Sequence, residues 1–116
     1  MGMFRDTANQ DFDIVKEMAE SLGSTGLKLE DLLERTCEAH TRAQELIARY
    51  NSWTSDPDRP SAALVNESIK EYNSFVDKAQ DARTWLLIQR EACGFRIHRN
   101  VDDHYPIPRK IRPLDP

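Results

Sequence analysis

Residues 29–50 read LEDLLERTCEAHTRAQELIARY, and one side of this stretch repeats at alternating steps of four and three residues. The positions on this stripe are Leu29, Leu33, Thr36, His40, Ala43, Ile47 and Tyr50, and the stripe is widened by Leu32, Ala39, Leu46 and Trp53. A seven-residue repeat of this kind places one face of an α-helix against a partner helix with a slight left-handed wrap. We therefore expect a long helix from about Leu27 to Trp53.

A second stretch carries the same spacing. Residues 65–86 read VNESIKEYNSFVDKAQDARTWL. Their stripe consists of Val65, Ile69, Tyr72, Val76, Ala79, Arg83 and Leu86, with a broader apolar flank at Phe75, Ala82, Trp85 and Ile88. The two prolines within Asn51–Pro60 break any helix there, and Gly94 favours a helix end just after Cys93. The sequence therefore predicts a second long helix, from Pro60 or Ser61 to about Cys93, that runs antiparallel to the first.

The short loop sets the register of this predicted hairpin. If Trp53 faces Pro60 across the turn, then Cys37 faces Val76. At about 1.5 Å per residue, Cys93 lies roughly 25 Å further along, well beyond the roughly 7 Å that a disulfide allows between α-carbons. We therefore expect two free thiols in a reduced protein, both as small core residues.

The two ends of the chain differ from the hairpin. Asn9–Leu22 carries apolar residues at helical spacing, and Gly23–Gly26 has the composition of a tight connection after a helix. Phe95–Pro116 contains four prolines and seven large apolar residues, so we expect an extended tail packed along the two long helices, on its own chain or on a dimer mate. The predicted fold is all-α: a short N-terminal helix and a long antiparallel helical hairpin form a three-helix bundle in residues 1–94. The extended, proline-containing tail occupies residues 95–116.

Composition limits the class of protein. With 116 residues, 39% hydrophobic and 31% charged, the chain has the length of one domain. It has no run of roughly 20 apolar residues, so we expect a soluble, cytoplasmic protein that does not enter a membrane. The net charge is −4, yet residues 94–116 hold five Lys or Arg against three Asp. We therefore expect nucleic acid to bind at most weakly, through the basic tail.

One spacing suggests an enzyme as the alternative reading. Arg35 and His40 have the Arg-x4-His form, in which His40 would act as a general base and Arg35 would hold a phosphate. A cluster of carboxylates near the same end of the hairpin consists of Glu17, Glu20, Glu30, Asp31 and Glu34. The alternative function is therefore a small helical ribonuclease or nucleotide hydrolase. Glu17 and Glu20 form a Glu-x-x-Glu pair, but no Glu-x-x-Asp pair follows on a later helix, so solvated helix faces are the simpler interpretation.

Two other groups have a structural and a functional interpretation. Arg83 falls on the apolar stripe opposite Glu30 and near Glu34, and a charge there is costly unless it is paired. We expect a structural ion pair, with an anion site as the alternative. In the tail, His98 and His104 flank a pair of aspartates, but their spacing matches no structural zinc site. We expect no metal ion and no cofactor.

These observations favour a non-catalytic helical protein–protein interaction module, an adaptor or regulatory subunit that forms a homodimer or binds another protein. Aromatic anchors usually dominate such interfaces. The residues expected to carry the contact are Tyr50, Trp53, Leu64, Phe75, Tyr105, Ile107 and Ile111.

Overall fold

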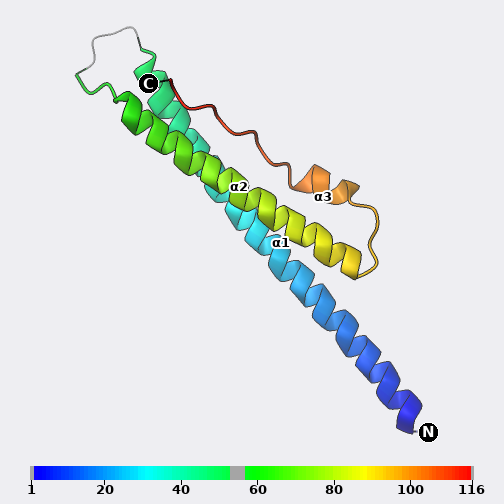
Figure 1. Cartoon of the computed structure of the whole chain (residues 1–116). Coiled ribbons are helices and arrows are strands. Elements are labelled where there is room, and N and C mark those ends of the chain that lie inside the picture. The colour runs from blue at the N-terminus through cyan, green and yellow to red at the C-terminus, as the bar shows by residue number, and fades with distance from the viewer. Residues whose placement is uncertain (1, 53–56, 116) are drawn as a thin grey trace.

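The fold is a helical hairpin with one helix much longer than the other (Figure 1). In this computed structural model, the backbone is described for residues 2–52 and 57–115, and side chains are described from Lys16 onward within those ranges. The helices are α1 (Gly2–Tyr50), α2 (Ala62–Ala92) and the short α3 (Arg99–His104). The described residues contain no strand. The predicted all-α class and the antiparallel pairing of two long helices are therefore confirmed.

The core of the hairpin is the pair of stripes that the sequence predicts. Six of the seven predicted stripe residues of α2 are buried, Arg83 being half-buried. The buried apolar residues of the hairpin are Leu29, Ala39, Ala43, Val65, Ile69, Tyr72, Val76, Ala79 and Leu86. Outside the stripe, Arg42 of α1 bonds Glu71 of α2 at 3.0 Å, which agrees with the register that places Trp53 opposite Pro60.

Both ends of α2 are fixed by local hydrogen bonds. Ser61 is the N-cap, and its hydroxyl oxygen accepts a bond from the Leu64 amide at 3.2 Å. After the helix, Gly94 adopts φ +93°, a left-handed conformation that costs glycine little. The Gly94 amide donates to Glu91 and the Phe95 amide donates to Arg90, which together satisfy two of the last helix carbonyls. The predicted limits of this helix are confirmed.

The N-terminal prediction is wrong. The sequence predicts a short helix that ends at Leu22 and a turn at Gly23–Gly26, but α1 runs without a break from Gly2 to Tyr50. A glycine inside a helix costs only about 1 kcal/mol relative to alanine. Packing offsets this cost, since Gly26 is buried and a methyl group there would lie 3.3 Å from the Tyr105 hydroxyl. Thr25, also buried, places its hydroxyl 2.6 Å from Gln89 Oε1 of α2.

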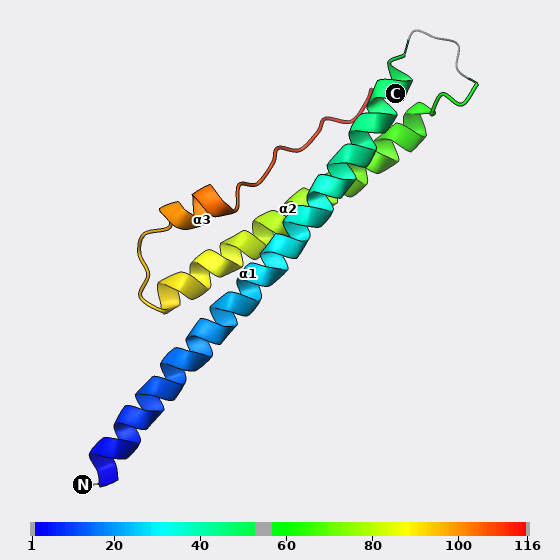
Figure 2. The ribbon, with the colours of Figure 1, turned by 180° about the vertical axis from the view of Figure 1, so that it is seen from behind.

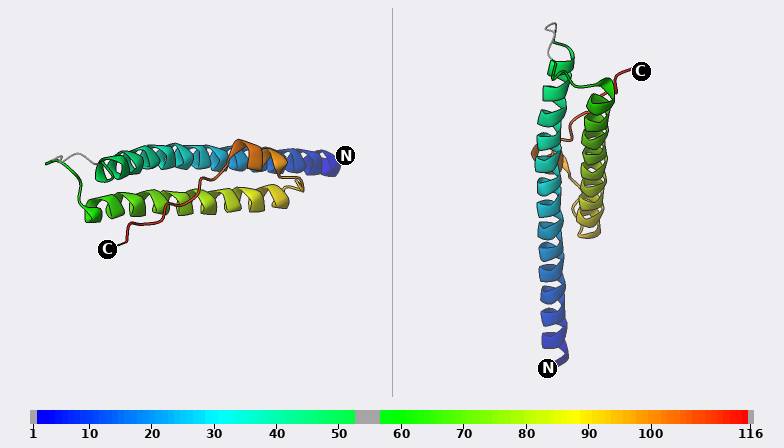
Figure 3. Two further views of the ribbon diagram at one scale, coloured as in Figure 1. Left: turned by 90° about the horizontal axis from the view of Figure 1, so that it is seen from above. Right: turned by 90° about the vertical axis from the view of Figure 1, so that its left-hand side faces the viewer.

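The continuous helix changes the architecture. Within the described residues no separate N-terminal helix folds back on the hairpin, so the predicted three-helix bundle is absent. The molecule measures 83 × 22 × 20 Å. With 49 residues in α1 and 31 in α2, α1 is longer by roughly 27 Å at about 1.5 Å per residue. The excess lies at the N-terminal end, where α1 continues alone past the end of α2 (Figures 1 and 3).

The tail returns along the hairpin, but it is not extended throughout as predicted. Its first part forms α3, which contains no proline and buries Val101 against the hairpin core. The helix ends before Pro106, because the residue preceding a proline is disfavoured in the helical conformation. Residues 106–115 carry no helix or strand and run back toward the loop between α1 and α2 (Figure 2).

Both described cysteines are free thiols, as the register predicts. The expectation that both are core residues is wrong, because Cys37 is exposed and Cys93 is half-buried. Cys37 follows Thr36, whose side chain occupies the buried stripe position and whose hydroxyl donates to the Leu32 carbonyl at 2.6 Å. Cys37 is therefore turned toward the edge of the stripe.

A glycine substitution tests the continuity of α1. Gly23 lies in the helix and a methyl group added there would meet nothing within 4 Å. Gly23→Ala should therefore raise the free energy of unfolding by about 0.5–1 kcal/mol, measured by urea denaturation. Gly94→Ala is the matched control, since its left-handed backbone should make the same change destabilising by about 1 kcal/mol. A loss of stability in Gly23→Ala would contradict a continuous helix.

Candidate functional site

The first candidate surface is the part of α1 that has no partner helix. Gln89, in the last turn of α2, contacts Ser21 and Thr25, so residues before Ser21 extend beyond α2. We call residues 2–20 the overhang. The four-and-three spacing of α1 continues into it through the sequence positions Leu22, Ala19, Val15 and Phe12. The stripe that packs on α2 in the hairpin therefore continues where α2 is absent.

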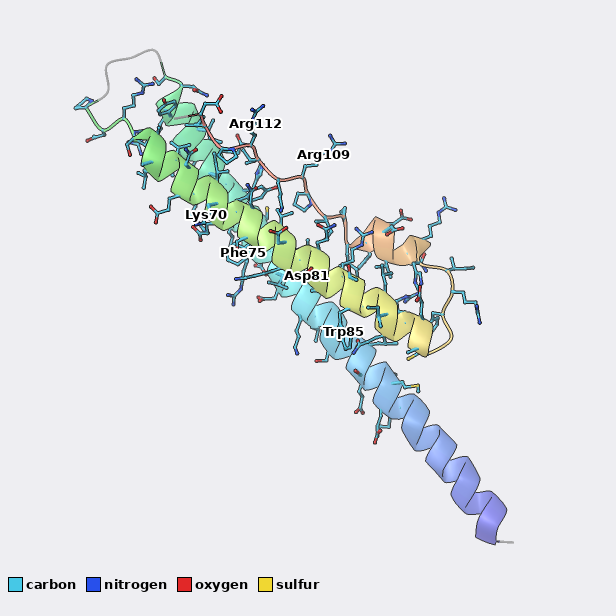
Figure 4. The ribbon with its side chains drawn as sticks, in the orientation of Figure 1. Lys70, Phe75, Asp81, Trp85, Arg109 and Arg112 are labelled. Carbon is cyan, nitrogen blue, oxygen red and sulfur yellow. The ribbon has the colours of Figure 1, made fainter. Side chains whose placement is uncertain are left out.

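Several exposed apolar side chains belong to the end of the hairpin from which the overhang leaves. Large hydrophobic residues that are exposed in the described part of the chain are Met18, Leu27, Leu64, Trp85, Ile88, Phe95 and Ile97. All of them except Leu64 belong to the end of the hairpin from which the overhang leaves. Trp85, 55% exposed, projects from α2 beside α1 (Figure 4). Such a concentration of apolar surface is typical of an interaction site.

A pocket of about 370 Å³ lies at the same end, between the root of the overhang, the end of α2 and α3. The Tyr105 hydroxyl closes one side of it and donates to Glu30 Oε1 at 3.3 Å. Burial, and then the negative charge of Glu30, raise the pKa of Tyr105 above its usual value.

The second candidate surface is the groove that holds the tail. Asn73 of α2 bonds the backbone of Ile111 twice: its Oδ1 accepts from the Ile111 amide at 2.9 Å, and its Nδ2 donates to the Ile111 carbonyl at 2.8 Å. Asn66 bonds Leu114 in the same way, at 2.7 Å and 3.1 Å. Two asparagines of one helix thus each hold both backbone polar groups of one tail residue.

Other contacts align the tail between these asparagines and α3. The Tyr72 hydroxyl donates to the Arg109 carbonyl at 2.6 Å, and burial raises the pKa of Tyr72. Lys110 Nζ lies 2.6 Å from Asp77 Oδ1. The tail crosses obliquely from the α1 side of the groove to α2 (Figure 3), while Arg109 and Arg112 point outward from it (Figure 4).

An apolar pocket of about 450 Å³ lies where the tail meets α1. Its walls are Leu33, Thr36, Cys37 and His40 on α1 and residues 106–108 of the tail. Ile107 packs against both core clusters of the hairpin. The tail thus covers the seam between α1 and α2 on one side.

The structure separates the two residues predicted for catalysis. Arg35 is exposed, bonds Asp31 at 3.0 Å and lines a shallow hollow with Glu34 and Glu38. His40 is half-buried, with its ring centroid 5.2 Å from that of Tyr72, and lines the apolar pocket under the tail. The two side chains therefore face different hollows, on different sides of α1. The acidic cluster is spread along α1 as well, with Glu30 turned toward Tyr105.

One predicted partner residue, Trp53, lies outside the described residues. The other predicted partner residues fall into three groups. At the loop end, Tyr50 is half-buried under the Arg59 guanidinium, 4.7 Å from the ring centroid, and Leu64 is exposed. Phe75 is half-buried on α2, on the side away from the tail. The predicted tail residues Tyr105, Ile107 and Ile111 are half-buried against the chain's own hairpin.

The predicted pairing of Arg83 with Glu30 or Glu34 is wrong. The Arg83 guanidinium pairs with Asp102 of α3 instead. The cause is α3 itself, which brings an aspartate to the rim of α2 where the sequence suggested only extended chain. Asp102 is thereby engaged by Arg83, while His98 bonds Glu91 at 3.1 Å. Within the described residues, no three His, Cys, Asp or Glu side chains gather as a metal site would require.

Sequence reasoning missed Asn66 and Asn73 as the residues that hold the tail. Both lie on the edge of the α2 stripe, seven residues apart, where a polar residue reads as part of the solvated face. The signal that was available is the repetition of the same amide residue at one heptad position. The tail that the amides bind is remote in sequence, so the pattern of α2 alone could not identify them.

The chain matches no protein-family model, no curated protein and no solved structure. Within its described part, none of the helices combines the length and the apolar character that crossing a membrane would require.

A charge substitution tests the observed pairing of Arg83. The side chains of Arg83 and Asp102 are 26% and 57% exposed, and ion pairs this accessible contribute little to stability. Arg83→Ala should therefore lower the free energy of unfolding by about 1 kcal/mol or less, measured by urea denaturation. Arg42→Ala, which removes the exposed pair with Glu71, is the control. A loss of about 3–5 kcal/mol would instead indicate a buried pair, as the sequence alone suggested.

Proposed function

We propose that the chain is a non-catalytic helical protein–protein interaction module that associates with a second copy of itself through the overhang. The observation that carries the proposal is the continuation of the α1 stripe beyond the end of α2. A lone helix of this length is only marginally stable in water, because most helical stability in proteins comes from packing of the apolar face. A partner that packs on its apolar face would therefore stabilise the overhang.

Burial of the apolar surface near the overhang would contribute favourable free energy to partner binding. Burial of apolar surface contributes about 25 cal/mol for each Å² removed from water. Met18 at the overhang, and Trp85 and Ile88 on the adjacent end of α2, are exposed in the single chain. A helix laid along the overhang would cover its stripe together with Met18.

A second overhang fits this surface in length. Two overhangs that pair antiparallel about Phe12 cover each other along their whole length. Each overhang carries five Asp or Glu against two Lys or Arg, and this arrangement brings Asp11 of one helix level with Asp13 of the other. Burial of the apolar stripe, and not charge, would therefore drive the pairing. Self-association through a two-fold contact is also the commonest form of oligomer.

The proposal also names the cellular compartment of the module. Cys37 is an exposed free thiol, which persists most readily in a reducing compartment. We infer that the module acts in the cytoplasm as an adaptor or regulatory subunit. The enzyme alternative loses support from the geometry, because Arg35 and His40 face different hollows.

Oligomeric state tests the proposal. The full chain should be a dimer in size-exclusion chromatography with light scattering, and the double substitution Met18→Glu and Ala19→Glu should convert it to a monomer. Both side chains are exposed in the single chain, so the hairpin itself should keep its stability. Leu64→Glu is the matched control, since Leu64 is an exposed apolar residue at the opposite end of the hairpin. A chain that is monomeric at its highest soluble concentration would refute self-association.

A further inference from the structure

The groove that holds the tail has the geometry of a peptide-binding site. Asn66 and Asn73 lie seven residues apart on α2, which separates them by roughly 10.5 Å along the helix axis. Leu114 and Ile111 lie three residues apart on the tail, and three residues of extended chain span roughly 9–10 Å. The spacing of one heptad on the helix therefore matches three residues of an extended peptide.

These asparagine contacts depend on the peptide backbone. Each amide accepts one backbone N–H and donates to the carbonyl of the same residue, whatever side chain that residue carries. One heptad further along α2 stands Gln80, which lines a pocket beside Pro108. Proline has no N–H to offer, so the series of amide contacts ends there in the tail.

Side chains add selectivity to this backbone recognition. Ile107 and Ile111 pack on the core cluster formed by Ala39, Tyr72 and Val76. Between them, Lys110 meets Asp77. A preferred peptide is therefore extended, carries branched apolar residues at a spacing of four, and is basic between them.

We propose that this groove binds an extended, basic and apolar peptide segment of a partner protein, and that the chain's own tail is its displaceable resident. The tail contacts the groove through half-buried side chains and single-residue backbone pairs. Most of the hairpin seam is packed by α1 and α2 themselves. The tail can leave while a peptide of the same chemistry takes its contacts. This site is separate from the overhang, so it holds whether or not the chain self-associates.

Binding of a labelled peptide to the full-length chain tests the proposal. The peptide has the sequence of residues 105–115, and the variant Ile111→Asp with Leu114→Asp weakens the resident tail without touching the groove. Fluorescence anisotropy should show the peptide binding this tail-release variant at least about tenfold tighter than it binds the natural chain. Asn73→Ala in the same background should weaken binding by about tenfold, since two hydrogen bonds are lost. Asn51→Ala, at an exposed asparagine outside the groove, should have no effect.

A charge-reversed peptide tests the selectivity. Replacement of the lysine that corresponds to Lys110 by glutamate should weaken binding, because Asp77 would then face a like charge. Equal binding of the two peptides would contradict the role of Asp77. Peptide binding that is unchanged by Asn73→Ala would overturn the asparagine recognition itself.

Amide hydrogen exchange on the natural chain separates a displaceable tail from a structural one. The amides of Ile111 and Leu114 should exchange faster than those of Ile69 and Val76 in the core of α2, because tail release does not require the hairpin to unfold. Equal protection of tail and core would overturn the proposal. Loss of helical circular dichroism in the tail-release variant would do so too, as would a helical variant that binds no peptide. Oligomeric state, measured separately, reports on the overhang alone.

Discussion

The whole structure depends on one constraint, which is that the apolar seam of α1 has to be covered along its length. In the hairpin α2 covers it, and buried side chains such as Leu29, Ala43 and Ile69 interlock at alternating steps of four and three. However, α1 has 49 residues and α2 has 31, so α2 cannot reach the rest. A two-helix hairpin also leaves its seam open on both sides, because two cylinders touch only along a line. The tail covers one of these sides.

The two candidate surfaces follow from this geometry. At the overhang we propose a helix as the cover, since the uncovered stripe keeps the helical spacing. Along the hairpin the cover is the tail, in which α3 buries Val101 in the core and residues 106–115 continue without helix or strand. The tail places Ile107 over the seam, and its backbone is held by Asn66 and Asn73. In the part of the chain that the structure describes, a cover is supplied for the groove and none for the overhang.

The pairing of the long helices could be predicted from sequence because it depends on periodicity, which is local. The stripe of α2, its Ser61 cap and its Gly94 end all agree with the structure. Predictions were wrong where residues distant in sequence determine the local structure or the ion pairing. Gly23 and Gly26 indicated a turn, but packing of Thr25 and Gly26 against α2 and Tyr105 keeps the helix continuous. Arg83 met Asp102 because α3 formed, which no pattern within α2 indicates. The asparagine contacts to the tail were missed for the same reason.

Proline placement explains why the tail fits its groove. Residues 106–115 contain Pro106, Pro108 and Pro113, each of which fixes φ near the extended value and removes an N–H that would otherwise need a partner. The two amides that α2 binds belong to Ile111 and Leu114, which are not prolines. An extended chain that is already restricted loses less conformational entropy when it docks. The same restriction prevents the tail from becoming a helix that could compete for the overhang. The prolines therefore suit the tail to the groove and not to the helical stripe of the overhang.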